Sequence, residues 1–360
     1  MTLPSMPDGI SPEWLTEVLR REGYLASNSS VVSVTREQVG DGVGMMSEVS
    51  RLCVSYDGSV DALPDSFVVK YPSQNKTNRE IAMSYNLYER EVRYFAELDP
   101  KTTAYSPRPY ITELSGDNFV ILMEDMSDYR VGDQIIGANL KDTARCMDEL
   151  AKLHATFWND VTELDWVPGI AESYHADNMA TLIAIGWPNM CEIFGDFIDP
   201  EIAAQGDAFI AGIRGLQEKM MVQPITLLHG DFRLENLFFG VTPDHRPMAI
   251  IDWQGPLVGM GIVDVALLLG QNTQTGVRQA HERELVSRYV RGLKNAGVVG
   301  YDETRAWQDY ELAILYNWVY VGVVAGTLDV HNERAFSWMS QMVARQSIAS
   351  LDLDVFRHLN

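Results

Sequence analysis

The chain has 360 residues, 46% hydrophobic and 22% charged, a composition typical of a globular protein long enough for two lobes. Its 50 acidic residues outnumber its 28 basic residues and give a net charge of −22, which disfavours binding to nucleic acids or to anionic membranes. A cationic substrate is compatible with this charge, although solubility alone explains the charge more simply.

Cysteine spacing and hydropathy indicate the cellular compartment in which we expect the protein. Cys53, Cys146 and Cys191 are far apart and lack metal-ligand spacing, so they predict reduced thiols and a cytoplasmic protein. The N-terminal residues contain neither a basic region nor an apolar core, so no secretory signal is visible. Residues 312–328 form the longest uncharged stretch, and we expect a buried helix there rather than a membrane span. The sequence leaves the oligomeric state open.

Residues 31–39 and 49–56 predict two strands on either side of a glycine-rich segment that contains Gly40, Gly42 and Gly44. Glycines at alternate positions allow the backbone to fold close over a ligand and to direct amide groups at phosphates. An ordinary glycine-rich hairpin is the alternative. The segment is not a Walker A loop, because no Gly-Lys-Ser or Gly-Lys-Thr follows.

Residues 67–70 predict a buried strand that ends in Lys70. After a glycine loop, a lysine at this position can pair with phosphate oxygens, whereas most lysines at strand ends are simply solvated. Residues 79–98 then predict a helix with Glu91 on its apolar face. An unpaired buried carboxylate is costly, so we expect Glu91 to hold Lys70.

The middle of the chain predicts a hairpin and a helical region. Residues 110–113 and 118–123 predict paired strands, and residues 140–158 predict a helix. His154 lies on the apolar face of that helix, which favours a hydrogen-bonded core histidine over a functional one. Residues 161–224 contain several apolar clusters, and they would help to line an acceptor pocket if the chain has the kinase-like fold that the resemblance named below implies. Their expected breaks are Pro168, Pro188 and Pro200.

Residues 229–236 contain Asp231 followed five residues later by Asn236, the spacing of the kinase catalytic loop. Phosphoryl transfer needs a carboxylate that faces the acceptor hydroxyl and two oxygen ligands for Mg²⁺. This motif therefore predicts a phosphoryl-transfer site. The alternative is structural, with Asp231 capping a turn that Asn236 ends.

Residues 237–239 and 248–251 predict two short strands, and a hairpin between them would bring Asp252 beside Asn236. Asp231 is then the candidate base or hydroxyl-orienting group, and Asn236 and Asp252 are the candidate metal ligands.

Two features near Asp231 refine this interpretation. Arg233 is expected either to contact the γ-phosphate or to form a structural ion pair, and His229 is expected to brace the loop. No long activation segment follows Asp252 and no Ala-Pro-Glu motif is present, which counts against a protein kinase.

These motifs resemble those of the aminoglycoside phosphotransferase and choline kinase superfamily, including its ecdysteroid kinase-like branch. The resemblance is carried by residues 229–236 and 251–253 and covers roughly residues 31–270. It implies an α+β, protein-kinase-like fold with two lobes. A small mixed α/β N-lobe with an antiparallel sheet would comprise residues 1–124, and a larger, mainly helical C-lobe would comprise residues 125–360.

The resemblance also implies roles that the residues alone do not. Backbone groups near Glu124 and Met126 would meet the adenine at a hinge, although an ordinary linker is the alternative. Asp264 matches the Asp of a later Asp-Leu-Ala motif and would brace the catalytic loop or cap a helix. Residues 303–328 and 332–350 predict terminal helices, whose Trp and Tyr residues are expected to be core.

The motifs and the resemblance together predict a kinase that phosphorylates a hydroxyl of a small molecule, with Mg²⁺·ATP bound between the lobes. The choice of ATP over GTP is implied by the resemblance alone. The acceptor is left open among aminoglycosides, choline-like alcohols, sterols and hydroxy acids, because specificity lies in variable loops. A regulatory pseudokinase that binds nucleotide or a metabolite is the alternative.

Overall fold

The computed structural model describes residues 3–4, 9–39, 46–58, 60, 63–328, 330 and 332–359. Gly40, Gly42 and Gly44 of the expected phosphate loop lie outside these residues. The chain forms two compact units. The first comprises Met1–Lys101, Ser106–Tyr129 and Ile251–Gly255, and the second comprises Thr102–Tyr105, Arg130–Ile250 and Pro256–Asn360.

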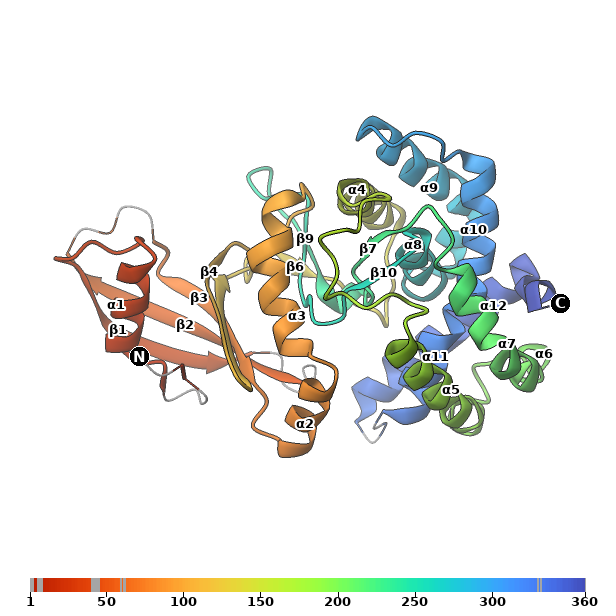
Figure 1. Ribbon diagram of the computed structural model, residues 1–360, viewed down its shortest axis with the longest axis horizontal. Helices are drawn as coiled ribbons and strands as arrows, with labels where there is room; N and C mark the ends of the chain where they lie inside the picture. Colours follow the sequence, from red (N-terminus) through yellow and green to blue (C-terminus); the bar gives the residue numbers. More distant parts are fainter. Residues whose placement is uncertain are drawn as a thin grey trace. The chain divides into compact units, whose positions relative to one another are not determined.

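The first unit is built on an antiparallel sheet, four of whose strands are labelled β1 to β4 in Figure 1. The described residues form it in the strand order β1-β2-β3-β5-β4. Its strands are β1 (Ser30–Gln38), β2 (Ser47–Asp57), β3 (Ser66–Pro72), β4 (Pro109–Ser115) and β5 (Asn118–Glu124). The predicted strands and the predicted hairpin of residues 110–123 are confirmed, because β4 and β5 pair directly.

Helix α1 (Pro12–Arg21) packs its apolar side against one face of this sheet. The helix begins where Ser11 Oγ accepts a hydrogen bond from Trp14 N–H, at 3.3 Å. Phe67 and Val69 of β3 lie in the same apolar core. Because side chains alternate along a strand, Lys70 lies on the opposite face.

The predicted helix of residues 79–98 is divided, and this expectation is corrected. It comprises α2 (Lys76–Ser84), α3 (Leu87–Arg93) and a π-helical turn (Tyr94–Leu98). Asn86 separates α2 from α3 with a φ of 54°, a left-handed conformation that asparagine tolerates. Tyr88 of α3 stacks on Phe119 of β5, with ring centroids 4.4 Å apart. Val120 packs with α1, so α3 lies on the other face.

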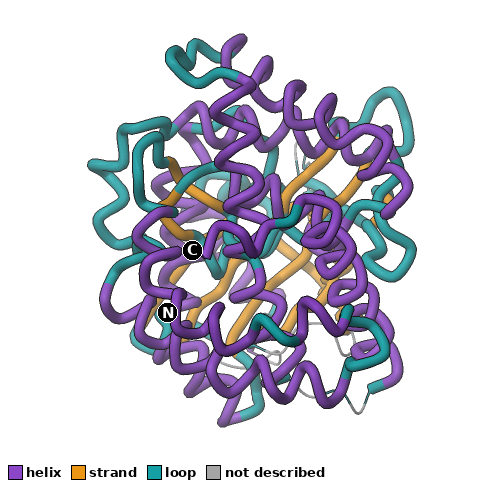
Figure 2. The backbone as a smooth tube through the Cα atoms, turned by 90° about the vertical axis from the view of Figure 1, so that its right-hand side faces the viewer, coloured by secondary structure: helices purple, strands orange, loops and turns teal. Residues whose placement is uncertain are grey.

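The second unit is mainly helical (Figures 1 and 2). Its helices are α4 (Leu140–Thr156), α5 (Ser173–Ile193), α6 (Pro200–Ala203), α7 (Gly206–Lys219), α8 (Ile262–Leu267), α9 (Thr275–Asn295), α10 (Glu303–Tyr316), α11 (Trp318–Thr327) and α12 (Glu333–Leu353). Its strands are β6 (Arg130–Val131), β7 (Thr226–Leu228), β8 (Leu237–Phe239), β9 (Met248–Ile250) and β10 (Leu257–Gly259). Within the described ranges, no helix combines the length and apolarity that crossing a bilayer requires.

Two sequence expectations for the helices are wrong in detail. Pro188 lies inside α5 instead of breaking it. Both Pro188 and Ala184 are exposed, so the carbonyl that loses its N–H partner can bind water. The predicted helix of residues 303–328 is divided at Asn317, whose Nδ2 donates to Val263 O at 3.1 Å.

Glycines allow α5 and α11 to pack with their backbones close together. A Cβ atom on Gly186 of α5 would overlap the backbone oxygen of Gly322 on α11, and a Cβ on Gly326 would overlap the oxygen of Gly186. Any larger residue would force the helices apart. This close packing fixes the position of α11 within the second unit.

Candidate functional site

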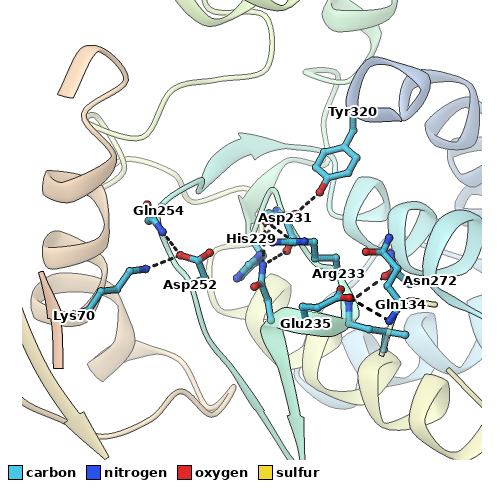
Figure 3. Close-up of polar contacts among 12 residues, drawn as sticks. Lys70, Gln134, His229, Asp231, Arg233, Glu235, Asp252, Gln254, Asn272 and Tyr320 are labelled. Atoms are coloured by element: carbon cyan, nitrogen blue, oxygen red, sulfur yellow. Dashed lines mark hydrogen bonds and ion pairs between the residues drawn. The ribbon is translucent and has the colours of Figure 1, made fainter. Parts of the chain in front are cut away.

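Lys70 places its ammonium group between two carboxylates. Its Nζ is 2.8 Å from Glu91 Oε1 and 2.7 Å from Asp252 Oδ1, the second of which is drawn in Figure 3. The side chains of Lys70 and Glu91 are 7% and 1% exposed, whereas that of Asp252 is 27% exposed. The expected contact between Lys70 and Glu91 is present. The contact with Asp252 was not predicted from the sequence.

The charges of this cluster do not balance. One ammonium faces two carboxylates, so the cluster has one excess negative charge when both carboxylates are ionised. Burial opposes the charged form of Lys70, but Asp252 and Glu91 outweigh it and raise the pKa of the amine. Burial also raises the pKa of Glu91 to about 7, against the attraction of Lys70. The partly exposed Asp252 is therefore the carboxylate of the cluster that can take a further cation.

Asp252 is held by the turn in which it lies. Its φ of 67° is left-handed, and its side chain accepts a hydrogen bond from Gln254 Nε2. The next residue, Trp253, is fully buried and donates from Nε1 to Ser106 Oγ at 3.1 Å. Its ring stacks on Tyr94, with centroids 3.6 Å apart. The anchored indole fixes the turn and so the direction of Asp252.

The expected hinge lies at the end of β5. Glu124 N–H donates to Arg108 O at 2.9 Å, and Met126 O accepts from Tyr129 N–H at 2.9 Å. Contact of this segment with the adenine stays a prediction.

Asp125, between these two residues, was missed by the sequence analysis. It accepts hydrogen bonds from Arg51 Nε at 2.9 Å, from Ser66 Oγ and from Ser127 N–H at 3.0 Å. Burial opposes ionisation, but these hydrogen bonds prevail and lower the pKa of Asp125. The ion pair with Arg51 ties the segment after β5 to β2.

In the second unit, the loop of residues 229–236 follows β7 and is braced by Asp264 of α8. The buried Asp264 carboxylate accepts hydrogen bonds from His229 N–H at 2.7 Å and from Gly230 N–H at 3.1 Å. Gly230 has a φ of 79°, a conformation that favours glycine. The expectation that Asp264 braces this loop is confirmed.

Two buried histidines support the same loop. His229 Nδ1 accepts a hydrogen bond from Asp231 N–H at 3.3 Å. His154 Nδ1 is 2.8 Å from Tyr289 Oη, and its Nε2 is 3.4 Å from Asp264 Oδ2. Both imidazoles are fully buried. Their expected structural roles, bracing the loop and bonding within the core, are confirmed by these contacts.

Three side chains hold the Asp231 carboxylate, and Figure 3 labels two of them, Tyr320 and Arg233. Oδ1 accepts from Tyr320 Oη at 2.6 Å, and Oδ2 accepts from Asn236 Nδ2 at 3.0 Å and from Arg233 Nε at 3.3 Å. Asn236 Nδ2 also donates to Asp231 O at 2.9 Å. Both bonds of Asn236 use the amide nitrogen, so its oxygen is the atom that can ligate a cation.

Arg233 forms an ion pair with Asp231, and its guanidinium lies 5.4 Å from the centre of the Trp338 ring on α12. The ion pair corresponds to one of the two roles considered from the sequence. Contact with a γ-phosphate stays a prediction.

Tyr320 was also missed by the sequence analysis. The expectation that the tyrosines of the terminal helices are core is wrong for Tyr320, whose hydroxyl binds Asp231 and whose ring is partly exposed. The two residues are 89 positions apart in the chain, so only the packing of α11 brings them together. No local spacing in residues 312–328 signals this contact.

The hairpin after Asn236 is confirmed, because β8 pairs with β9 and places Leu237 opposite Ile250. Asp252 follows β9 and belongs to the first unit. Among the described residues, no group of three or more His, Cys, Asp or Glu side chains could hold a metal. Mg²⁺ usually needs only one or two protein oxygens besides phosphate and water, so Asn236 and Asp252 are suitable in type.

Comparison with known proteins identifies the family. The sequence model of the ecdysteroid kinase-like family matches residues 41–298. The chain belongs to this family. The family resemblance expected from the sequence is therefore confirmed, and the enzyme is a small-molecule kinase that acts on hydroxyl groups. No curated protein matches this ecdysteroid kinase-like chain.

Solved structures share the fold. An ethanolamine kinase from Plasmodium vivax is 14% identical, with 91% of this chain and 85% of that chain covered and a TM-score of 0.52. A variant of aminoglycoside 2'-phosphotransferase-IIIa in complex with GDP is 13% identical, with 94% and 97% covered and a TM-score of 0.54. These likenesses confirm the protein-kinase-like fold.

Proposed function

We propose that this ecdysteroid kinase-like protein transfers the γ-phosphoryl group of ATP to a hydroxyl of a small molecule, with Mg²⁺ as cofactor. The observation that carries the proposal is the Asp231 carboxylate, which three side-chain donors hold in one orientation. A carboxylate fixed in this way can align an acceptor hydroxyl and take its proton as the new bond forms.

In the proposed reaction, the acceptor oxygen attacks the γ-phosphorus while the bond from phosphorus to the β,γ-bridging oxygen breaks and ADP leaves. The proton of the hydroxyl passes to Asp231 and then to solvent. We assign Lys70 to the α- and β-phosphates, with Glu91 holding it in place. Arg233 would neutralise charge on the transferred group, which requires it to leave its ion pair with Asp231.

Asn236 and Asp252 are the proposed Mg²⁺ ligands. The excess negative charge around Asp252 and the amide oxygen of Asn236 fit a hard cation that prefers oxygen. When bound, Mg²⁺ would neutralise charge on the phosphate oxygens.

The remaining proposed nucleotide contacts are backbone groups. Residues 1–124 would bind the nucleotide, and residues 125–360 would supply the catalytic loop and the acceptor pocket. The backbone positions are Gly40, Gly42, Gly44, Glu124 and Met126. The glycines would direct amide groups at the phosphates, and the last two residues would meet the base.

The acceptor is proposed only as a hydroxyl-bearing small molecule. Two structural neighbours are named as an ethanolamine kinase and an aminoglycoside phosphotransferase. Amino alcohols and aminoglycosides are therefore the first candidate acceptors in the panel to be tested. Choline-like alcohols, sterols and hydroxy acids complete it.

The test is incubation of the protein with Mg²⁺ and ATP or GTP and each member of the panel, followed by mass spectrometry of the products. Asp231→Asn should bind nucleotide but give no phosphorylated product, and Asp252→Ala should also weaken the Mg²⁺ dependence of nucleotide binding. Turnover by Asp231→Asn at the parent's rate would remove the proposed role of that carboxylate. Nucleotide binding with no product would favour a regulatory pseudokinase, and phosphorylation of a generic protein would favour a protein kinase.

A further inference from the structure

The two oxygens of the Asp231 carboxylate have different kinds of partner. Oδ2 accepts N–H groups from Arg233 and Asn236, which belong to the same loop. Oδ1 accepts the O–H group of Tyr320, which comes from α11, at 2.6 Å. Figure 3 shows the phenol pointing from its helix toward Asp231.

An acceptor hydroxyl would need the same position as this phenol. It must donate an O–H group to Asp231 from roughly 2.6–3.2 Å before transfer. Asn236 still occupies Oδ2 when Arg233 leaves its ion pair, whereas Oδ1 is held by Tyr320 of another helix, so we assign the acceptor to Oδ1. The hydroxyl of Tyr320 meets this requirement in chemical type, in distance and in the atom that it contacts.

The fold presents Tyr320 on a firmly packed element. Gly322 and Gly326 of α11 allow backbone contact with Gly186 of α5, and Trp318 Nε1 donates to Ser350 Oγ of α12 at 2.9 Å. These contacts lie on both sides of Tyr320 in the sequence. The position of the phenol is therefore set by helix packing within the second unit.

The phenol also stays in its donor form. Burial, together with the negative charge of Asp231, raises the pKa of Tyr320 well above its ordinary value. It therefore carries a proton throughout the neutral range and donates it to Oδ1. Tyr320 as a whole is only partly exposed to solvent.

We propose that Tyr320 is an internal stand-in for the acceptor hydroxyl, which occupies Asp231 Oδ1 and keeps water from it until an acceptor displaces the phenol. This inference rests on the proposed function. Its consequence is that Tyr320 limits wasteful hydrolysis of ATP and selects acceptors that can compete with a phenol for Oδ1.

Removing only the hydroxyl tests this role. In Tyr320→Phe, the vacated place beside Oδ1 has room for a water molecule, which Asp231 can orient. The water oxygen would attack the γ-phosphorus, the bond to the β,γ-bridging oxygen would break, and ADP and inorganic phosphate would form. One water proton would pass to Asp231 and then to solvent.

The experiment measures ADP release from Mg²⁺·ATP without any acceptor. Tyr320→Phe should raise this rate by roughly tenfold to a hundredfold, the factor that corresponds to loss of a hydrogen bond to a charged group. The double variant Tyr320→Phe/Asp231→Asn should lose the increase. Tyr316→Phe is the matched control, since this buried tyrosine of α10 undergoes the same substitution and should leave the rate unchanged.

Thermal unfolding and Mg²⁺-dependent binding of a fluorescent ATP analogue accompany the assay. If folded Tyr320→Phe binds the analogue but releases ADP no faster than the parent, the stand-in role is refuted while the proposed function stands. An increase that survives Asp231→Asn also refutes it, because the water would not act through Oδ1. If the parent protein itself does not bind the ATP analogue, the proposed function is refuted, independently of the role of Tyr320.

Discussion

Replacing Lys70 with methionine tests the charge cluster of the first unit. Methionine fills a similar apolar volume, so the main change is loss of the ammonium group between Glu91 and Asp252. Asp252 is 27% exposed and can be hydrated, but Glu91 is 1% exposed and would be buried without its cation. Breaking a buried pair in this way costs about 3–5 kcal/mol of unfolding free energy.

This cost depends on pH, because Glu91 can avoid it by taking up a proton. Burial raises the pKa of Glu91 to about 7 in the parent, and loss of the opposing attraction of Lys70 raises it further. A folded carboxyl with a raised pKa loses stability as the pH rises through that pKa. The deficit of Lys70→Met relative to the parent should therefore be small near about pH 6 and approach its full size near about pH 9.

Urea denaturation followed by circular dichroism at both pH values measures the deficit. Lys76→Met is the control. The Lys76 side chain is 89% exposed and its ammonium lies 3.7 Å from Glu80, a long and solvated ion pair. Its loss should change the free energy of unfolding by less than about 0.5 kcal/mol. Adding Glu91→Gln to Lys70→Met should flatten the dependence on pH. Parent-like stability of Lys70→Met near about pH 9 would refute the reasoning.

Three further changes follow from other contacts. Gly186→Ala should destabilise the protein by about 1–3 kcal/mol through overlap with α11, whereas Gly215→Ala, in open space on α7, should stabilise it by about 0.5–1 kcal/mol in thermal unfolding. Asp264→Ala removes the acceptor of two loop N–H groups and should lower kcat by about tenfold or more at unchanged nucleotide affinity, as measured by steady-state kinetics and calorimetry. Burial raises the pKa of Asp99 from 3.8 to about 6, so the parent loses stability as the pH rises through that window. Above about pH 6, Asp99→Asn should therefore be more stable than the parent by about 2–3 kcal/mol, as measured by urea denaturation at pH values below and above the window.

Each of these predictions has a distinct contrary result. Equal melting temperatures for Gly186→Ala and the parent would contradict the close contact of α5 and α11. Full activity of Asp264→Ala would show that the loop keeps its geometry without this brace. A stability difference for Asp99→Asn that is the same on both sides of the window would mean that ionisation of Asp99 is not the cause.

Local patterns in the sequence predicted the parts of the site that depend on nearby residues. The position of Glu91 on the apolar face of a helix predicted its contact with Lys70, because helical periodicity decides which side chains turn inward. The hairpin after Asn236 was equally predictable, since two short apolar runs separated by glycine and proline define it.

Contacts between distant parts of the chain could not be predicted from local patterns. The pair of Arg51 and Asp125 and the contact of Tyr320 with Asp231 join residues 74 and 89 positions apart. Their partners are chosen by strand order and helix packing, which periodicity does not encode. The break at Asn86 was missed because only its left-handed backbone, and no proline or glycine, interrupts the helix.

The discontinuous first unit has a consequence for biosynthesis. Its sheet is complete by Tyr129, but Trp253, which stacks on Tyr94, arrives only with Ile251–Gly255. When the ribosome has synthesised the residues of the sheet, the Tyr94 ring therefore still lacks its stacking partner. Domains generally fold in order of synthesis, but this one must wait until most of the chain has emerged.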